Sequence, residues 1–331
     1  MIPTFNSSKS LAKCLSSIIV QKYPKDLIEI IVVDGGSVDS TIEIAKNYGV
    51  DKILSNPLKT AETAKAIGVN AASGDLVVFI DSDNELDNPN WLRDMVQPFK
   101  EKDIFGCEAL YWVYKPNEAY VNRYFALSGA NDPLTLFAGN YCRYSFFTKK
   151  WTEVKLKRVE NRKSYLKVTF YPGITPVTGA GNGGILRRDV LRKAHYEPYF
   201  ADIDVVNELT KLGHTSYARV QHATYHSFAK SYRDYLLKCL RRSFDYFYFR
   251  KKNLRSYPWA RFTRRGLPKF LFSTVTVIPL LLQVRSGIRN RPDVAWFAHL
   301  GICWITLIAY IVARLRVLFW NKPLSRGIMM I

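Results

Sequence analysis

Cysteines are few in this chain of 331 residues, and they are widely spaced. None of the five stands in a Cys-x-x-Cys motif, so we expect neither a disulfide framework nor a thiolate metal site, and a reducing compartment is indicated. No secretory signal precedes the first predicted strand, which favours a cytoplasmic location for the N-terminal part. The cysteines are Cys14, Cys107, Cys142, Cys239 and Cys303.

Acidic residues are scarce in the C-terminal part of the chain. Residues 229–331 contain 20 Lys and Arg but only 3 Asp and Glu, whereas residues 1–228 contain 28 and 25. Nearly all of the formal net charge of +20 therefore belongs to the C-terminal part. Such an excess indicates binding to nucleic acid or to an anionic membrane surface. Because it accompanies long apolar segments, a membrane is favoured and no nucleic-acid partner is expected.

Two apolar segments follow residue 269. Val294–Val312 is uncharged over about 19 residues, close to the ~20 that cross a bilayer, and predicts a transmembrane helix. Phe270–Val284 is shorter and contains Pro279, so it either spans a thinned bilayer or lies partly within it. Together they predict a transmembrane hairpin with a basic tail over residues 270–331. The basic flanks indicate cytoplasmic ends, but three arginines between the segments oppose that orientation: Arg285, Arg289 and Arg291.

Residues 229–269 combine basic and aromatic side chains. The stretch Phe228–Lys269 holds 13 Lys and Arg against only Asp234 and Asp245, and aromatic residues recur throughout it. This composition is typical of a helix that lies in the interface of a membrane. We therefore expect an interfacial segment between the N-terminal part and the apolar segments.

Two carboxylates one residue apart, Asp81 and Asp83, follow the predicted strand Leu76–Ile80. The short, branched and aromatic run predicts a strand buried on both faces, as in a parallel α/β sheet. Side chains at i and i+2 of an extended backbone point the same way, so both carboxylates would face one site. Ligands of such sheets bind beyond the carboxyl ends of the strands, where paired oxygens suit a divalent cation and its diphosphate. The alternative is a surface turn.

The first 86 residues alternate predicted strands and helices. Apolar residues at helical spacing cover Ser7–Val20, and a strand over Ile28–Val33 leads into a glycine-containing loop. Helices are expected over Thr41–Tyr48 and Ala61–Ala72. This order predicts a doubly wound, Rossmann-like α/β fold with a mostly parallel sheet. The loops after its strands would bring five side chains to one edge: Thr4, Asn6, Asp34, Asp81 and Asp83.

Three motifs stand in order along this part of the chain. They are Ile-Pro-Thr-Phe-Asn at residues 2–6, Val-Val-Asp-Gly-Gly-Ser-Val-Asp-Ser-Thr at 32–41 and Phe-Ile-Asp-Ser-Asp-Asn-Glu-Leu at 79–86. As an ordered set they resemble the nucleotide-sugar half of the family 2 glycosyltransferases of the GT-A fold. The resemblance extends to about residue 228 and implies a GT-A catalytic domain over residues 1–228.

The resemblance implies that the first two loops hold the nucleoside of a UDP- or GDP-sugar. Asp34 would hydrogen-bond the base, Lys65 falls near the nucleotide, and Asp81 would lie against the ribose. The full set of implied nucleotide-sugar-binding residues is Pro3, Thr4, Phe5, Asn6, Asp34, Lys65 and Asp81.

A divalent metal is implied at the same place. Asp83 would ligate a Mg²⁺ or Mn²⁺ that bridges the diphosphate, with Asp81 beside it. His226 falls where the family often carries a metal- or phosphate-binding histidine. His222 lies four residues earlier on the same predicted strand and is expected to pack or to face solvent.

The catalytic base is implied at a helix start. Family members commonly have Glu-Asp where this chain has Ala201 and Asp202, so the glutamate is missing and the aspartate is kept. Asp202 would take the proton from an acceptor hydroxyl in an inverting transfer, with Asp204 as the fallback base. The structural alternative for Asp202 is a helix N-cap.

Three further stretches leave alternatives open. The Gly-rich stretch Thr178–Gly184 lacks the Gly-Lys-Ser/Thr of a P-loop, and close approach of backbone to sugar would make Gly183 and Gly184 acceptor contacts. The predicted hairpin Val154–Tyr171 alternates basic and apolar residues. This pattern indicates either RNA binding or a solvated strand face, and we favour the solvated face. Asp132 is interpreted as a capping or turn residue rather than an acceptor contact.

Departures from the family pattern bear on function. Gly35 stands where many members have a second carboxylate, so the base preference stays open. The best local match to the Gln-x-x-Arg-Trp of processive synthases is Lys238–Arg242, which lacks the glutamine and the tryptophan. Single-sugar transfer is therefore favoured, with Arg241 as a candidate diphosphate contact.

We expect a membrane-anchored, metal-dependent, inverting glycosyltransferase with a cytoplasmic catalytic domain. Its acceptor would be a polyprenyl phosphate or a lipid-linked glycan at the bilayer. The alternatives are a non-catalytic membrane scaffold that keeps the fold and a basic nucleic-acid-binding protein, which would bind RNA or DNA with a steep salt dependence.

Overall fold

The computed structural model describes residues 1–179 and 181–319, which form two compact units. Unit 1 comprises Met1–Val113 and Lys155–His226, and unit 2 comprises Tyr114–Val154 and the chain from Ser227 onward. The boundary at residue 226 lies close to the predicted end of the catalytic domain. Residues 114–154, expected in that domain, group with unit 2 instead. The predicted basic tail beyond residue 319 lies outside the described residues.

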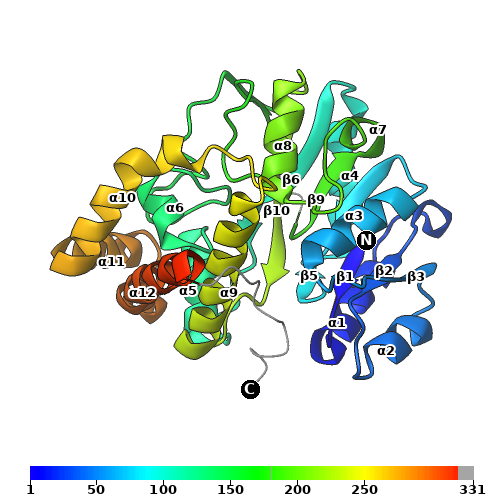
Figure 1. Cartoon of the computed structure of the whole chain (residues 1–331). Coiled ribbons are helices and arrows are strands. Elements are labelled where there is room, and N and C mark those ends of the chain that lie inside the picture. The colour runs from blue at the N-terminus through cyan, green and yellow to red at the C-terminus, as the bar shows by residue number, and fades with distance from the viewer. Residues whose placement is uncertain (180, 320–331) are drawn as a thin grey trace. The chain divides into compact units, whose positions relative to one another are not determined.

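Unit 1 is built on two sheets (Figure 1). The first is parallel, in the order β1-β2-β3, and consists of Ile2–Thr4, Ile31–Asp34 and Lys52–Ser55. The second is mixed, in the order β4-β9-β6-β10-β8-β7, with β5 paired to β10. Its strands are β4 (Leu76–Phe79), β5 (Asn84–Leu86), β6 (Ile104–Trp112), β7 (Arg158–Asn161), β8 (Tyr165–Thr169), β9 (Gly184–Arg187) and β10 (Ser216–His226).

The N-terminal residue links the two sheets. The Met1 ammonium donates to the Val78 carbonyl at 2.8 Å, and the Met1 carbonyl accepts from the Ile80 N–H at 3.2 Å. Bonds to residues on either side of Phe79 are the pattern of parallel neighbours, here β1 and β4. The first strand is therefore short but fully buried, and it places the loop after residue 4 beside the loop after β4.

Helices cover both faces of the parallel sheet. α3 (Ala61–Ala71) lies on one face, and α1 (Ser8–Ile19) and α2 (Thr41–Asn47) lie on the other (Figure 1). Leu11 and Leu15 of α1 are fully buried at helical spacing, which bears out the predicted amphipathic pattern. The α/β fold class is thus confirmed. The remaining helices of unit 1 are η1 (Lys25–Leu27), α4 (Trp91–Val96), η2 (Gln97–Lys100), α7 (Arg188–Leu191) and α8 (Asp202–Lys211).

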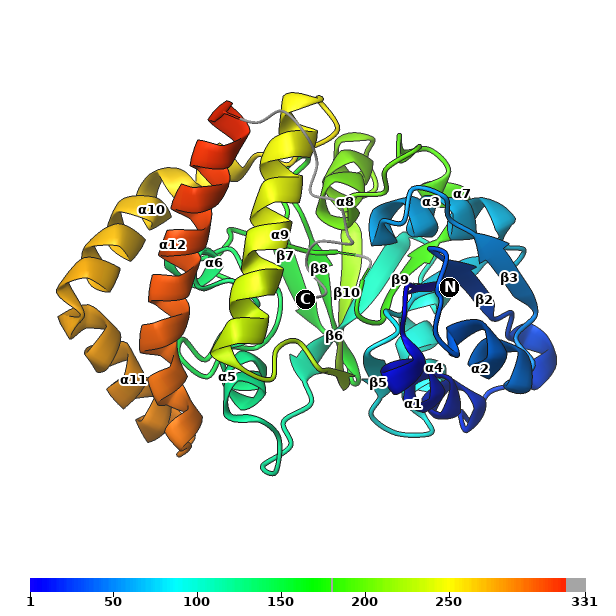
Figure 2. The same cartoon turned by 60° about the horizontal axis from the view of Figure 1, so that its bottom comes forward.

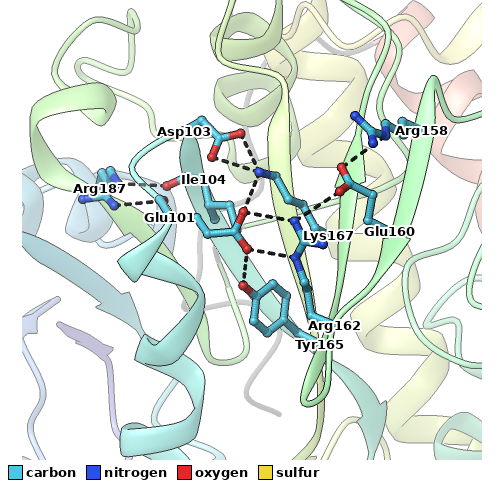
Figure 3. Close-up of polar contacts among 9 residues, drawn as sticks. All are labelled: Glu101, Asp103, Ile104, Arg158, Glu160, Arg162, Tyr165, Lys167 and Arg187. Carbon is cyan, nitrogen blue, oxygen red and sulfur yellow. Dashed lines mark hydrogen bonds and ion pairs between the residues drawn. The ribbon is translucent and has the colours of Figure 1, made fainter.

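The predicted basic hairpin is strands β7 and β8, and it is held by ion pairs. Figure 3 shows the Glu101 carboxylate bonded to Arg162, Lys167 and Tyr165. Lys167 also pairs with Asp103 at 2.8 Å. Arg162 and Lys167, the basic side chains nearest the start of β6, are thus paired with carboxylates of unit 1, and the solvated strand face stays a prediction.

Unit 2 is helical in its described residues. Its helices are α5 (Tyr120–Ser128), α6 (Pro133–Phe137), α9 (Tyr232–Lys251), α10 (Trp259–Thr276), α11 (Ile278–Asn290), η3 (Val294–Phe297) and α12 (Ala298–Phe319). Asp132 caps α6, since its Oδ1 accepts from the Leu134 N–H at 2.9 Å, as the capping interpretation predicts. α9 and α12 lie side by side along their length (Figure 2).

One helix of the described chain, Val294–Phe319, is long and apolar enough to cross a membrane. The predicted segment Phe270–Val284 does not form a straight helix. It is divided between α10 and α11, whose axes differ in direction by 95°. The break lies at Val277, two residues before Pro279 in the first turn of α11, because proline suits a helix start and disrupts a helix interior.

Candidate functional site

The Asp81–Ser82–Asp83 segment is a turn and not the end of a strand. β4 ends at Phe79, and the Asn84 N–H donates to the Asp81 carbonyl at 2.9 Å, which closes a four-residue turn. The i, i+2 rule holds only for extended backbone and does not apply to this turn, so the expectation that both carboxylates face one site stays a prediction. Asp81 lies beside Lys65 and Asp83 lies beside His226. The turn alternative describes the backbone correctly.

Lys65 joins two of the predicted site residues. Its ammonium, buried on α3, lies 2.8 and 3.0 Å from the two carboxylate oxygens of Asp202 and 3.9 Å from Asp81 Oδ1. Burial alone would lower the pKa of Lys65, but the charges of Asp202 and Asp81 outweigh it and raise the pKa above its usual range. Lys65 is therefore a fixed cation between two carboxylates that are far apart in the sequence.

Burial raises the pKa of Asp81 despite the opposing charge of Lys65, and nearby Asp83 and Asp202 raise it further. The Asp81 side chain is nevertheless 30% exposed, so a ligand can reach it. This end of unit 1 thus carries an excess of negative charge. A divalent cation or a cationic ligand group would reduce the mutual repulsion of the three carboxylates.

Asp83 and His226 form the second half of the site. The His226 Nε2 lies 3.8 Å from Asp83 Oδ2, and the imidazole packs beside Trp112 with ring centroids 5.3 Å apart. Because His226 pairs with Asn84 in the antiparallel β5–β10 ladder, the sheet fixes the position of the histidine relative to the turn. His222 lies elsewhere, with its Nε2 3.0 Å from Asp94 Oδ2, in agreement with a packing role.

The loops after β1 and β2 are bonded to each other through Asp34. Its Oδ1 accepts from Thr4 Oγ1 at 2.9 Å and from Ser37 Oγ at 2.6 Å, and its Oδ2 accepts from the Gly36 and Ser37 N–H groups. Four bonds occupy the usual acceptor capacity of a carboxylate. Asp34 therefore holds the loop together. The predicted hydrogen bond between Asp34 and a nucleotide base stays a prediction, and it would require one of these four hydrogen bonds to break.

Phe5 explains why a glycine follows Asp34. A Cβ added to Gly35 would lie 3.2 Å from Phe5 Cδ2 and 3.4 Å from the Lys59 Cα. The Lys59 ammonium in turn lies 5.9 Å from the centre of the Phe5 ring. A side chain at position 35 would therefore require Phe5 or the Lys59 backbone to move by a few tenths of an ångström. Asn6, which adopts φ 49°, accepts from the Val38 N–H and completes the contact between the two loops.

Packing within unit 1 accounts for the two glycines that were expected to contact the acceptor, and that contact stays a prediction. Gly183 has φ +86°, and an added Cβ would lie 2.9 Å from Trp91 and 3.0 Å from Thr224. Gly184 is buried in β9, opposite Phe79. Both positions are explained by packing within unit 1, and neither needs an acceptor sugar. Pro3 likewise lies within β1.

Gly181 and Asn84 belong to the site and were not predicted. The Gly181 N–H donates to Asp202 Oδ2 at 3.0 Å, and an added Cβ would lie 2.8 Å from that oxygen and 3.1 Å from Lys65 Nζ. The Asn84 side chain accepts from the Asp81 N–H and donates to Asp83. The Gly-rich stretch was a sequence signal for Gly181, whereas no local pattern distinguishes Asn84.

Two predicted residues stand apart from this group. Asp204 is buried on α8, and the aspartate that reaches Lys65 is Asp202, at the first position of the same helix. Its N-cap is Ala201, so the capping alternative for Asp202 is wrong. Arg241 is exposed on α9 of unit 2 and is not among the residues that unit 1 brings together.

The fit to a metal ion is partial. In the described part of the chain, no group of three or more His, Cys, Asp or Glu side chains is arranged to hold a metal. The chemistry of Asp83 and His226 nevertheless suits Mg²⁺ or Mn²⁺, whose remaining positions are commonly filled by water and by substrate phosphate. Asp83 with His226 would hold such an ion, while Asp81 is engaged with Lys65.

The comparison that decides the family concerns the N-terminal part of the chain. The sequence profile described as glycosyl transferase family 2 matches residues 1–193. The chain belongs to glycosyl transferase family 2. Thr4, Asp34, Lys65, Asp81 and Asp83 all lie within the matched residues, whereas Asp202 and His226 follow them.

Two curated family relatives match shorter stretches. Glycosyltransferase AglE of Haloferax volcanii is 32% identical over 88 residues, which are 25% of this chain and 29% of the relative. The dolichyl N-acetyl-alpha-D-glucosaminyl phosphate 3-beta-D-2,3-diacetamido-2,3-dideoxy-beta-D-glucuronosyltransferase of Methanococcus voltae is 36% identical over 84 residues, 24% of this chain and 26% of the relative. The match thus spans less than a third of the length of these relatives.

A solved structure extends the similarity to the fold. The mannosyltransferase PcManGT of Pyrobaculum calidifontis, in complex with GDP-Man and Mn²⁺, is similar with a TM-score of 0.56 and 15% identity. The similarity covers 97% of this chain and 86% of that one. At this identity it supports the GT-A fold and leaves substrate open.

Proposed function

We propose that the chain transfers a sugar from a nucleoside-diphosphate sugar to a membrane-associated acceptor, with inversion at the anomeric carbon. The observation that carries the proposal is the cluster of Lys65, Asp81 and Asp202 in unit 1. A family 2 domain with this cluster has a cation for a diphosphate and a carboxylate for an acceptor hydroxyl.

The residues divide the work as follows. Thr4, Phe5 and Asn6 form the loop expected to receive the nucleoside, and Asp34 keeps that loop in place. The Lys65 ammonium would bind the diphosphate of the donor and weaken its ion pair with Asp202. The Asp202 carboxylate would then accept the proton of the acceptor hydroxyl. A Mg²⁺ or Mn²⁺ held by Asp83 and His226 would supply further positive charge to the leaving diphosphate.

The acceptor and the donor are proposed from chemistry and from relatives. The Methanococcus voltae relative is named for a dolichyl-linked sugar phosphate, and the Pyrobaculum calidifontis structure contains GDP-Man and Mn²⁺. We propose a polyprenyl phosphate or lipid-linked glycan as acceptor, a UDP- or GDP-sugar as donor, and single-sugar transfer. The catalytic unit would face the cytoplasm, with unit 2 at the membrane.

Product analysis tests this proposal. The chain, in membranes or with lipid extract, is supplied with a panel of UDP- and GDP-sugars, and new glycolipids are identified by mass spectrometry. We expect one donor to give a product in the presence of Mn²⁺ or Mg²⁺. Asp83→Ala should abolish metal-dependent transfer and leave the thermal unfolding temperature nearly unchanged, because Asp83 is partly exposed on a turn.

A non-catalytic scaffold is the second candidate, favoured by Ala201 and Gly35 in place of expected carboxylates. Isothermal titration with UDP and GDP separates the two. An enzyme should bind one of them in a Mn²⁺-dependent way, and a scaffold should bind neither.

A further inference from the structure

Exposed apolar side chains gather where α10 meets α11 in unit 2. The two helices change direction by 95° at Val277, which has φ +64°, an unusual conformation for a β-branched residue. Phe272, Val275 and Ile278 are 64%, 63% and 67% exposed, and Leu282 is 61% exposed. These residues form the outer side of the bend, and the exposed polar residue between them is Thr276.

The inner side of the bend is packed. Phe270 of α10 and Leu280 of α11 are fully buried in a cluster with Leu134 and Cys303. Straightening the pair would draw these side chains out of the cluster, at a cost of about 1.5–3 kcal/mol for each large apolar residue. The bend is therefore a built feature of unit 2 rather than a broken helix that can straighten.

Close helix contacts hold both arms. A Cβ added to Gly266 of α10 would lie 2.6 Å from the Ala138 Cα, and one added to Gly287 of α11 would lie 2.5 Å from the Trp296 ring. Only glycine allows these approaches, so each arm is docked on the rest of unit 2 on both sides of the bend.

Basic residues border the apolar bend on both sides. Residues 270–284 contain no charged residue, and the flanking arms contain no acidic residue. The exposed basic residues are Arg261, Arg264, Arg265 and Lys269 on α10, with Arg285 and Arg289 on α11. Two basic borders around an apolar tip match the anionic headgroup layer and the hydrocarbon of a single leaflet.

The arms are too short to cross a bilayer. At 1.5 Å per residue, each uncharged arm is about 10 Å long, and two arms at this bend carry the tip only about 7 Å below the flanking charges. The hydrocarbon core is about 30 Å thick, whereas interfacial helices bury their apolar face by about 5–10 Å. The geometry of the α10–α11 pair therefore excludes a crossing of the bilayer by this pair and fits its insertion into one leaflet.

The packing of α12 against α9 points the same way. Figure 2 shows the two helices side by side, and Arg314 and Arg316 of α12 lie over the Phe247 and Phe244 rings of α9. α9 exposes Arg241 and Arg242 near its middle. Because α9 packs along α12, a membrane-crossing α12 would carry Arg241 and Arg242 of α9 toward the hydrocarbon, which is strongly unfavourable. α12 instead presents one apolar stripe, which includes Trp304, Ile308 and Ile311, as an exposed face.

We propose that unit 2 is a monotopic membrane-docking module: the α10–α11 bend inserts into one leaflet of an anionic bilayer, the apolar stripe of α12 lies on the same leaflet, and no described helix crosses. This replaces the transmembrane hairpin predicted from the sequence. It does not depend on the proposed sugar transfer.

Vesicle binding tests the inserted tip. Purified chain is mixed with vesicles of phosphatidylcholine with 30% phosphatidylglycerol and floated on a density gradient. Phe272→Ser combined with Ile278→Ser should lower the partition coefficient by at least about tenfold, because both exposed side chains would enter hydrocarbon. Leu27→Ser, at a 66% exposed leucine of unit 1, is the matched control and should bind as the unaltered chain does. Equal binding by the double variant would overturn the proposal.

Cysteine labelling tests the topology. Ala260→Cys and Ser286→Cys place a thiol on the exposed part of each arm, and Thr276→Cys places one at the tip. In intact membranes, an impermeant maleimide should label the first two from the same side, and the third only after detergent is added. Labelling of Ser286→Cys solely from the opposite side would show a crossing, and free labelling of Thr276→Cys would show that the tip is not inserted. Either result contradicts the proposal.

Discussion

Lys65 is the residue on which the candidate site depends. One ammonium is shared between Asp202 and Asp81, whose positions in the sequence are 121 residues apart, and Gly181 leaves the space for it. In this arrangement the Lys65 ammonium is paired with the Asp202 carboxylate at 2.8 Å. A diphosphate that attracts the ammonium would release Asp202, so donor binding should precede proton transfer.

Replacement of Asp202 tests its role as the base. In Asp202→Asn the side chain can no longer take a proton, and we expect turnover to fall by about 10²–10⁴-fold, the usual contribution of a general base. The KM for the donor should change by only a few-fold. Steady-state kinetics with saturating acceptor measure both. Asp204→Asn is the companion variant, and a larger loss of turnover in it than in Asp202→Asn would refute the assignment.

Position 35 tests the explanation for the missing carboxylate. Gly35→Asp should destabilise unit 1 by about 1–3 kcal/mol, because the new side chain meets Phe5 and the Lys59 backbone at 3.2 and 3.4 Å. Urea unfolding measures the change. Gly74→Ala is the control, since its Cβ would meet only a carbonyl oxygen at 3.5 Å. Unchanged stability of Gly35→Asp would mean that the loop yields and that packing does not explain the glycine.

At the scale of elements, turns and short strands position the site more than helices do. The turn after β4 separates Asp81 from Asp83, and the β5–β10 ladder brings His226 to Asp83. The β7–β8 hairpin is in turn fixed to the start of β6 by the bonds of Glu101. The turn after β4 is local, whereas the β5–β10 ladder and the Glu101 bonds join segments distant in sequence. The arrangement of β5, β8 and β10 therefore depends on tertiary contacts.

The hairpin contact predicts a pH dependence. Bonds from Arg162, Lys167 and Tyr165 lower the pKa of Glu101 to about 2, from an ordinary value of 4.5. The folded chain therefore binds this proton less readily than the unfolded chain, and the stabilisation is complete above pH 4.5 and lost as the pH falls toward 2. Glu101→Gln should lower the free energy of unfolding at pH 7 by about 1 kcal/mol.

Urea titrations between pH 7 and pH 2 measure this dependence. The decline between pH 4.5 and pH 2 should be shallower in Glu101→Gln than in the unaltered chain. Glu43→Gln, at an exposed glutamate of α2, should follow the unaltered chain throughout. A decline of the same steepness in Glu101→Gln would show that another group governs the acid sensitivity.

At the scale of the whole molecule, the two units differ in composition and exposed surface. Unit 1 holds the predicted donor-binding residues, and unit 2 holds nearly all of the exposed apolar helix surface and the basic excess. This difference is in keeping with the proposed binding of a water-soluble donor by unit 1 and of an acceptor at a bilayer by unit 2.

Hydrogen exchange tests this division. Addition of UDP or GDP with Mn²⁺ at 100 times the dissociation constant should stabilise the unit that binds it by about 2.7 kcal/mol. We expect slower exchange in residues 1–113 and 155–226 and little change in α9–α12. Protection confined to unit 2 would place the nucleotide site elsewhere.

Much of unit 1 was predictable because its signals are local. Periodic apolar residues marked α1, and the ordered motifs marked the family to which the chain belongs. The bent pair α10–α11 was not predictable, because an apolar run of this length is compatible with a span, a re-entrant pair or a core helix. Asn84 was missed because an asparagine in a turn has no distinctive pattern.

The sequence by itself determined the order of strands and helices, the family and the concentration of positive charge in the C-terminal part, because these depend on spacing and composition. Only the tertiary structure decided that Asp81 meets Lys65 while Asp83 meets His226, that Asp34 serves its own loop, and that the second apolar region bends through 95°. Such contacts join residues that are neighbours in space alone, and the free energy of packing that selects them is absent from any local stretch of the chain.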